Sequence, residues 1–362
     1  MNEQQGGDFM KKKILALCLA SVMVLSFAAC GGSSSSSSSS AASQQSEVSN
    51  EKITFKASHP RPEGSDNDIY TKELLSKMQE ALGEDRFDYE VYPNSELGDY
   101  TVVQEAVSMG EVDMCVQSVS TNVDQSLTIA TAPYLVENWE QAKQMYNTTD
   151  GLVSNYVAEA LEKQNIKLIA MIPKYFNAVA TAKEPNDVHN LFGEKGLKMR
   201  VPTMKSYELV AQTLGYQTTP MNWSDLFTSM QTGIVDGCFG GGPEAFYTGI
   251  KEVMKCLLLY KNAFEPHWIM MNLDDWNKFT PEEQEKITEI AAQLEKEAFA
   301  TAQENDEKMI QNFRDEGFEV IDFSDEEISE ISSKIRSDVW PQLEDTFDPE
   351  AFKAIKAELG IE

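Results

Sequence analysis

Two short stretches share one pattern, Thr232-Gly233-Ile234-Val235-Asp236-Gly237 and, earlier in the chain, Met109-Gly110-Glu111-Val112-Asp113-Met114. In each, a helical segment leads into a glycine, and an aspartate follows at the same spacing before strand-forming residues. Glycine readily takes the left-handed conformation that ends many helices. Each stretch therefore predicts a helix, a glycine cap and a strand, and the repetition indicates two α/β lobes built on the same unit.

Around these stretches, short β-like runs alternate with longer helical ones. Ile53 to Ala57 and Asp88 to Tyr92 predict strands, and the regions near Asp68 to Leu82 and Tyr100 to Met109 predict helices. This order is typical of mainly parallel sheets covered by helices. The fold class is therefore α/β.

The last part of the chain has a different composition. Beyond Pro281 it is rich in glutamate and lysine at helical spacing, with a strand-like interruption at Phe318 to Ile321. It predicts long C-terminal surface helices that close the fold.

The chain from Glu51 onward, about 310 residues, is long enough for two lobes of ordinary size. No low-complexity break divides it, so the lobes must interleave. We assign residues 51–176 and about 266–305 to lobe I, and residues 177–265 and about 306–362 to lobe II.

A cleft between the lobes follows from this arrangement. Ligands of open α/β sheets bind beyond the carboxyl ends of the strands. The segments Cys115 to Ser120 and Cys238 to Pro243 follow the two predicted strands, so we expect both to face the cleft.

The N-terminal segment has the pattern of a secretory signal. Lys11 to Lys13 precede a short apolar run and the small residues Ala28 and Ala29. We assign residues 1–29 to a signal peptide. Met10 is an alternative start, because residues 1–9 contain acidic side chains and no basic one.

Cys30 follows at the position where a bacterial lipoprotein signal places its lipidated cysteine, and residues 26–30 resemble a lipobox apart from Phe27. Residues 30–50 are rich in serine and predict a flexible tether. Acyl chains contribute about 0.8 kcal/mol per buried methylene, so two or three of them hold a protein on a membrane. We expect an extracytoplasmic protein that is anchored to the outer face of the cytoplasmic membrane, or a periplasmic one. The alternative is an ordinary signal peptide, with no such role for Cys30.

The formal net charge is −29, and removal of residues 1–29 would leave −30. So acidic a chain is a poor partner for nucleic acid or for an anionic lipid surface. An anionic small ligand stays compatible, because its binding depends on the local field in a cleft.

Few residues suggest catalysis or metal binding. Cys115, Cys238 and Cys256 lack CxxC spacing, so we expect buried free thiols, no metal site and no cofactor. The sequence has no nucleophile elbow, P-loop or His-Glu-x-x-His motif. His59 lies at the end of the first predicted strand, where we expect it to line the cleft or cap a helix rather than act as a base.

The segment Gly196-Leu197-Lys198-Met199-Arg200-Val201-Pro202 contains the sharpest candidate for ligand binding. It predicts a short strand that ends near Arg200, because Pro202 cannot continue the ladder. A guanidinium at such an exit can bind a carboxylate with two parallel hydrogen bonds. On composition alone, a surface ion pair is the alternative role for Arg200.

Five segments, taken in order, resemble the solute-binding subunits of TRAP (tripartite ATP-independent periplasmic) transporters. They are Pro93-Asn94-Ser95-Glu96-Leu97-Gly98-Asp99, Gly110 to Asp113, Ala132-Pro133-Tyr134-Leu135, Gly196 to Pro202, and Pro220 to Gly237. The resemblance covers essentially the whole chain beyond the signal. It implies a two-lobed, periplasmic-binding-protein-like fold that closes around a small organic acid without catalysis, and it implies small and large membrane subunits as partners. We expect a monomer.

The resemblance also implies roles for individual residues. The arginine that matches Arg200 forms the main salt bridge to a substrate carboxylate, and an aromatic ring at the position of Trp223 packs against the ligand. The segments around Asp99 and Gln117 line the opposing lobe. Our working hypothesis adds contacts from Phe239, Asn177, Thr203 and Tyr247.

Two positions depart from the family pattern. Gly240 aligns with an asparagine that helps to hold the carboxylate in many members, and Asn177 aligns with a second arginine found in some. We therefore expect a smaller carboxylate clamp, with backbone amides of the glycine run as candidate donors. The ligand need not be a dicarboxylate.

Structural roles stay open for several of these residues. Trp223 could be a core aromatic, and Asp99 could be the N-cap of the helix that follows it. Gln117 and Thr203 are equally compatible with contacting a ligand and with supporting the fold.

Three other functions stay open for the whole chain. One is a binding protein of an ABC importer or a sensor, one is a secreted enzyme whose groups meet only in space, and one is an adhesin or structural lipoprotein. The segments Gly196 to Pro202 and Pro220 to Gly237 favour the TRAP class over the first of these.

Overall fold

The computed structural model describes residues 51–361, which fall within one compact unit. The predicted signal peptide, Cys30 and the tether lie outside the described residues. No helix among residues 51–361 has the length and apolar character that a bilayer crossing requires.

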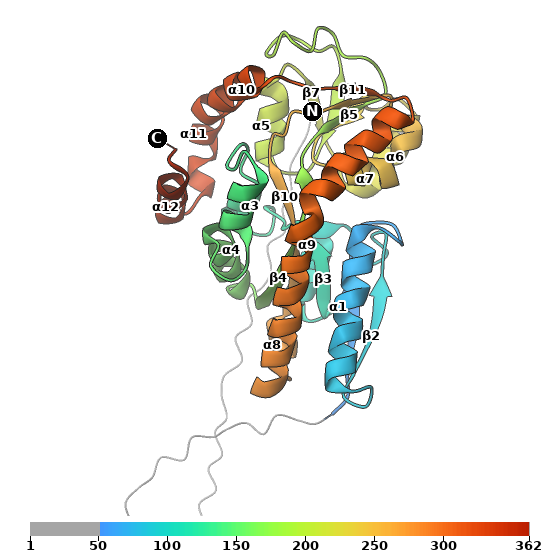
Figure 1. Ribbon diagram of the computed structural model, residues 1–362, viewed down its shortest axis with the longest axis vertical. Coiled ribbons are helices and arrows are strands. Elements are labelled where there is room, and N and C mark those ends of the chain that lie inside the picture. The colour runs from blue at the N-terminus through green and yellow to red at the C-terminus, as the bar shows by residue number, and fades with distance from the viewer. Residues whose placement is uncertain (1–50, 362) are drawn as a thin grey trace, which may run out of the picture. The chain divides into compact units, whose positions relative to one another are not determined.

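The first sheet has five strands in the order β2-β1-β3-β10-β4 (Figure 1). Strand β1 pairs in parallel with β2 and β3, whereas β10 runs antiparallel to β3 and β4. The bounds are β1 Ile53–Ser58, β2 Phe87–Tyr92, β3 Met114–Gln117, β4 Ile166–Phe176 and β10 Phe264–Asn272.

The second sheet has six strands in the order β11-β9-β5-β8-β6-β7. Strand β6 lies between β7 and β8 and is parallel to both. The bounds are β5 Val179–Thr181, β6 Lys198–Val201, β7 Gln217–Pro220, β8 Gly237–Cys238, β9 Cys256–Leu258 and β11 Glu319–Ile321.

The α/β class and the two sheets confirm the predicted fold class, although the sheets are mixed rather than mainly parallel. The reason is the path of the chain, which leaves the first sheet after β4, enters the second at β5 and returns at β10. Strand β10 then pairs antiparallel with both of its neighbours. The chain thus passes between the two sheets more than once.

The helices begin and end close to the predicted residues. Helix α1 begins at Asp66 because the Ser65 side chain caps its first turn, and α2 coincides with the prediction at Tyr100–Met109. The bounds are α1 Asp66–Leu82, α2 Tyr100–Met109, α3 Trp139–Tyr146, α4 Leu152–Glu162, α5 Lys205–Thr213, α6 Leu226–Gln231, α7 Pro243–Gly249, α8 Leu273–Trp276, α9 Pro281–Asp315, α10 Asp325–Asp338, α11 Trp340–Leu343 and α12 Pro349–Leu359.

The two repeated stretches adopt the same local structure. Gly110 and Gly233 both have a φ of 74°, and each ends a helix in the left-handed region. Asp113 then accepts a hydrogen bond from the backbone amide of Lys56 at 2.7 Å, and Asp236 accepts one from the amide of Lys198 at 3.0 Å. Each aspartate thus ties its strand to the neighbouring strand, which explains the shared spacing.

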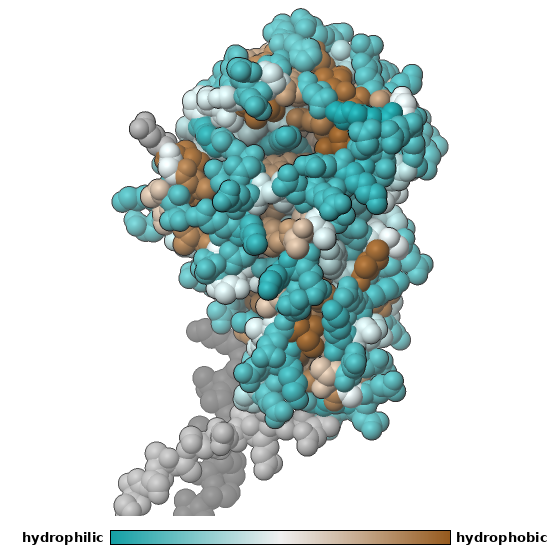
Figure 2. Space-filling model, viewed as in Figure 1, coloured by the Kyte–Doolittle hydropathy of each residue, from teal (hydrophilic) through white to brown (hydrophobic). Residues whose placement is uncertain are grey.

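Helix α9, 35 residues long, confirms the prediction of a long C-terminal helix. A capping box of Thr280 and Glu283 fixes its start. It packs on α1 and β4 beside the first sheet and on α7 and β11 beside the second (Figure 1). Hydrophilic residues cover most of the face that Figure 2 shows, as the acidic composition requires.

Candidate functional site

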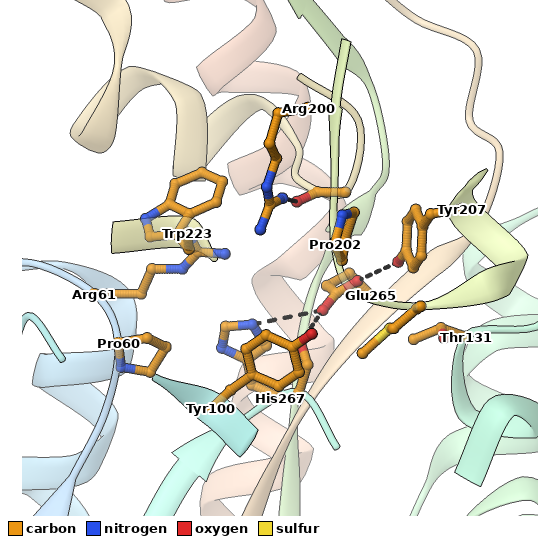
Figure 3. A pocket seen from close by; sticks show the side chains of 13 residues that line it. Pro60, Arg61, Tyr100, Thr131, Arg200, Pro202, Tyr207, Trp223, Glu265 and His267 are labelled. Carbon is orange, nitrogen blue, oxygen red and sulfur yellow. Dashed lines mark hydrogen bonds and ion pairs between the residues drawn. The ribbon is translucent and has the colours of Figure 1, made fainter. Parts of the chain in front are cut away.

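One cavity is lined by residues that come from both sheets (Figure 3). The space between its walls amounts to about 510 Å³, part of it open to solvent. Its lining comprises Pro60, Arg61, Tyr100, Ser118, Thr131, Arg200, Pro202, Met204, Tyr207, Trp223, Gly240, Glu265 and His267. Of the residues predicted to contact a ligand, Arg200, Trp223 and Gly240 are part of this lining.

Arg200 lies near the end of β6, and its side chain is almost fully buried, at 2% exposure. Its Nε donates to the carbonyl of Met221 at 3.0 Å, and its Nη1 donates to the carbonyls of Phe239 at 3.1 Å and Gly240 at 3.4 Å. These contacts hold the guanidinium at the cavity without neutralising it. Within residues 51–361 its positive charge has no carboxylate partner, which is unusual for a buried cation.

Arg61 is a second buried guanidinium at the cavity, and the sequence pattern did not point to it. It follows β1 and is 5% exposed. Its Nη2 donates to the Tyr175 hydroxyl at 3.0 Å, whereas Nε and Nη1 are buried without a hydrogen-bond partner in the described part of the chain. The available signal was its position just beyond the first strand, close to the predicted site residue His59.

The segment Pro93 to Asp99 supports the loop that carries Arg61. The backbone amide of Asn94 donates to the carbonyl of Arg61 at 2.8 Å, and the amide of Ser95 donates to the carbonyl of His59 at 3.2 Å. Asn94 and Ser95 both have positive φ angles, 55° and 59°. The Pro93-to-Asp99 segment therefore positions a cationic loop.

Trp223 connects the two arginines. The Cζ atom of Arg61 lies 4.1 Å from the centroid of its ring, and the Cζ of Arg200 lies 5.7 Å away. The ring also stacks on Phe246, with centroids 6.5 Å apart. A π-face next to two guanidiniums stabilises like charges that would otherwise repel each other. Trp223 thus combines packing against Phe246 with a place in the cavity wall.

Glu265 contributes the one carboxylate among these lining residues. Its Oε1 accepts a hydrogen bond from the Ser118 hydroxyl, and its Oε2 accepts from Tyr207 at 3.1 Å and from Asn177 Nδ2 at 3.4 Å. Burial raises the pKa of Glu265, and the Ser118 hydrogen bond and the charge of Arg61 oppose that rise. Because both of its oxygens accept hydrogen bonds, this buried carboxylate is held in a fixed position in the cavity wall.

The histidines near the cavity are buried beside polar side chains. His267 Nε2 lies 3.7 Å from Glu265 Oε1, and His59 Nε2 lies 3.3 Å from Asp68 Oδ1. Burial lowers the pKa of both imidazoles, and for His267 the charge of Arg61 lowers it further. Both rings are therefore neutral near pH 7, and His59 lies behind the cavity wall next to α1.

Gly240 has a structural reason for being glycine. Its φ is +77°, and a Cβ atom there would lie 2.4 Å from Cγ of Pro202. An asparagine, as in many family members, would collide with this proline unless the loop moved. The Gly240 carbonyl accepts from Arg200 instead, so the backbone contributes to holding the arginine.

Three residues that were predicted to contact a ligand lie just outside the cavity lining and support it. They are Phe239, Gln117 and Asn177. Phe239 is fully buried against Tyr216, with ring centroids 5.2 Å apart. Gln117 donates to the carbonyl of Tyr100 at 2.5 Å, and Asn177 donates to the Tyr207 hydroxyl at 2.9 Å.

Thr203 and Asp99 join elements of the two sheets rather than line the cavity. The hydroxyls of Thr203 and Tyr100 are 2.7 Å apart, and Asn122 donates to Thr203 at 3.0 Å. Asp99 caps α2 by accepting from the Thr101 amide at 2.9 Å, and it also accepts from Asn222 at 2.7 Å. The capping role weighed for Asp99 is therefore present, together with a contact across the cavity.

Tyr247 lies away from the cavity. Its hydroxyl donates to Glu316, and Lys251 Nζ lies 3.9 Å from its ring centroid. It thus joins α7 to the end of α9. The described cysteines, Cys115, Cys238 and Cys256, are buried free thiols as predicted.

Two guanidiniums without a carboxylate partner among residues 51–361 thus face one cavity lined from both sheets, and such a cavity is typical of the class of proteins that bind a small ligand between two α/β lobes. The particular family is shown by the sequence as a whole. Residues 58–344 match the bacterial extracellular solute-binding proteins of family 7, the DctP family, and the chain belongs to that family.

Similar proteins that have a name are solute-binding proteins as well. The C4-dicarboxylate-binding periplasmic protein DctP of Rhodobacter capsulatus is 24% identical over 273 residues, which are 75% of this chain and 80% of the relative. A TRAP periplasmic solute-binding protein from Haemophilus influenzae with bound L-gulonate superposes with a TM-score of 0.73 at 18% identity, covering 84% of this chain and 99% of that one. The sugar acid binding protein DctPAm of Advenella mimigardefordensis, in complex with galactonate, has a TM-score of 0.75 at 17% identity and covers 85% and 97%.

Proposed function

We propose that this protein is the extracytoplasmic solute-binding subunit of a TRAP transporter and captures a small organic acid. The observation that carries the proposal is the pair of buried guanidiniums, Arg61 and Arg200, which face one cavity without a carboxylate partner in residues 51–361. The family membership and the acids named for its relatives support it.

In this proposal the ligand carboxylate lies between Arg200 and Arg61, and an apolar or ring face packs on Trp223. A hydrogen bond to a charged group contributes about 1.5 to 3 kcal/mol net. A buried, unpaired cation is costly, so an incoming carboxylate also removes an existing penalty. Both effects favour binding of an acid over a neutral analogue of the same shape.

Ligand capture requires that the two sheets approach and separate. We propose that residues 51–176 with about 266–305 move as lobe I, and residues 177–265 with about 306–362 as lobe II. The described chain changes sheets between Phe176 and Val179 and again between Leu258 and Phe264, which is consistent with crossings near these bounds. Closure would shield the ion pairs from water and strengthen them.

The remaining partners follow from the family and from the N-terminal sequence. We propose that the loaded protein delivers its acid to the small and large membrane subunits, and that a lipid on Cys30 keeps it at the outer face of the cytoplasmic membrane. Metabolic labelling with an alkyne fatty acid tests the anchor, with Cys30→Ala as the unlabelled control. Labelling of both proteins alike would rule the anchor out.

Replacement of Arg200 tests the acid site. We expect Arg200→Ala to abolish binding of organic acids in titration calorimetry, because the ligand loses its main charge partner. Arg314→Ala is the matched control, since Arg314 forms a surface pair with Asp322 at 2.6 Å and does not line the cavity. Thermal unfolding of both variants reports whether they fold. Unchanged affinity in a folded Arg200→Ala protein would remove Arg200 from the site.

A further inference from the structure

Glu265 gives the cavity a second electrostatic feature beyond the arginine pair. Figure 3 shows Arg61, Trp223 and Arg200 on one side of the cavity and Glu265 with Tyr207 on the other. A ligand that places its carboxylate on the arginines therefore extends toward Glu265.

The hydrogen bonds around Glu265 define it as an acceptor. Asn177 Nδ2 donates to the Tyr207 hydroxyl oxygen, which leaves the phenol proton for Glu265 Oε2. The Ser118 hydroxyl donates to Oε1. A carboxylate can accept about four hydrogen bonds, so capacity remains for donors from a ligand.

The formal charges of the lining give the charge of the ligand. Arg61 and Arg200 are cations, Glu265 is an anion and His267 is neutral, so one positive charge is in excess. Lys174, which pairs with Asp66 at 3.2 Å and Glu244 at 3.4 Å, does not line the cavity, and neither do its two partners, so this balance counts the lining residues alone. A singly charged acid would leave the closed cavity neutral, whereas a dianion would bury a negative charge.

We infer that Glu265 is a specificity-determining residue that selects a monocarboxylate carrying hydroxyl groups and rejects a dicarboxylate. Hydroxyl groups at the far end of the ligand donate to Glu265. A second carboxylate at that end faces Glu265 at close range, which costs either like-charge repulsion or uptake of a proton. This inference rests on the proposed function, because it assumes that an acid binds to the arginines.

Matched pairs of acids test the inference. D-galactonate and galactarate differ only in whether the last carbon is an alcohol or a carboxylate, and 4-hydroxybutyrate and succinate form a shorter pair. In calorimetry with the unmodified protein, we expect the hydroxy acid of the pair that fits to bind about 100-fold more tightly than its dicarboxylate, the ratio expected for a like-charge clash of a few kcal/mol.

Glu265→Gln should reduce that ratio to about tenfold or less, because the repulsion disappears while an acceptor remains. Glu295→Gln is the matched control. Glu295 is also a buried carboxylate with donors on both oxygens, but they come from Thr148 and Met171, and it does not line the cavity. We expect this control to keep the ratio of the unmodified protein.

The outcomes separate the two proposals. If the unmodified protein binds the dicarboxylate as tightly as the hydroxy acid, the inference about Glu265 is wrong and the acid site stands. If Glu265→Gln weakens both members of a pair alike, Glu265 only supports the fold. If no acid of either pair binds to folded protein, the proposed function fails and the inference fails with it.

Discussion

Arg61 and Arg200 show how single residues set the chemistry of this site. Both guanidiniums are buried, and both are held by groups that do not neutralise them, a hydroxyl for Arg61 and three carbonyls for Arg200. Within residues 51–361 neither cation has a carboxylate partner, which supports our proposal that a ligand completes their surroundings.

Asp306 is a residue whose titration should affect stability. It lies on α9, and its Oδ1 is shielded from solvent without a hydrogen-bond partner in the described chain. Burial raises its pKa to about 7, although the Phe176 amide and Lys261 favour the charged form. Because the folded-state pKa exceeds the ordinary value, ionisation of Asp306 destabilises the fold as pH rises from about 4 to about 7.

We therefore expect Asp306→Asn to raise the melting temperature at pH 8 by about 1 to 2 °C, the shift that corresponds to about 1 kcal/mol in a folded part of about 310 residues. Below pH 4 the variant and the unmodified protein should unfold at the same temperature, since both are then neutral at this position. Differential scanning calorimetry across this pH range measures the difference. Glu304→Gln, an exposed change on the same helix, should have little effect at any pH.

At the scale of elements, the helix–glycine–strand unit could be predicted closely. The spacing of glycine and aspartate correctly placed the ends of α2 and α6 and the starts of β3 and β8 within a few residues. This worked because a left-handed cap is a property of the local backbone and needs no information from distant residues. The direction of β10 could not be predicted in the same way, because it depends on which strands the chain meets on its return.

Replacing the capping glycine after α6 should lower the free energy of unfolding by a definite amount. Gly233 has a φ of +74°, and a Cβ atom at this position would meet no other atom within 4 Å, so Gly233→Ala is penalised by backbone strain alone. We expect a loss of about 1 kcal/mol in the free energy of unfolding, measured by urea denaturation. Gly233→Asn should lose less, because asparagine tolerates the left-handed conformation. Equal stability of the alanine variant and the unmodified protein would contradict the strain argument.

At the scale of the whole molecule, the hydrogen bonds that join residues 51–176 to residues 177–265 include three near the cavity. They join Tyr100 and Asn122 to Thr203, and Asp99 to Asn222. Their partners lie 103, 81 and 123 residues apart in the chain. These contacts must break when the lobes separate, so they belong to the closed form in our proposal.

Removal of these links should favour the open form. The two hydrogen bonds of Thr203 are neutral and contribute about 0.5 to 1.5 kcal/mol each, and the bond from Asn222 to the Asp99 carboxylate contributes about 1.5 to 3 kcal/mol. The double variant Thr203→Val and Asn222→Ala should therefore raise the Kd for an organic acid by at least about tenfold. Stopped-flow binding should place most of that change in the dissociation rate, and X-ray scattering should show a larger radius of gyration without ligand. Thr232→Val, which removes a hydroxyl bonded within its own helical turn, is the control. Unchanged Kd and scattering in the double variant would contradict the closing role.

The sequence by itself determined the α/β class, the two glycine caps and the candidate Arg200, because each depends on a few consecutive residues whose backbone preferences act locally. The Pro93-to-Asp99 segment could be recognised as family-like, but its role in supporting the Arg61 loop depends on contacts that no spacing reveals. Only the tertiary structure shows that Arg61, Trp223 and Glu265 meet at one cavity and that Tyr247 lies away from it. The physical reason is that the charge balance of a site is a sum over residues from distant parts of the chain, and local patterns do not encode which of them meet.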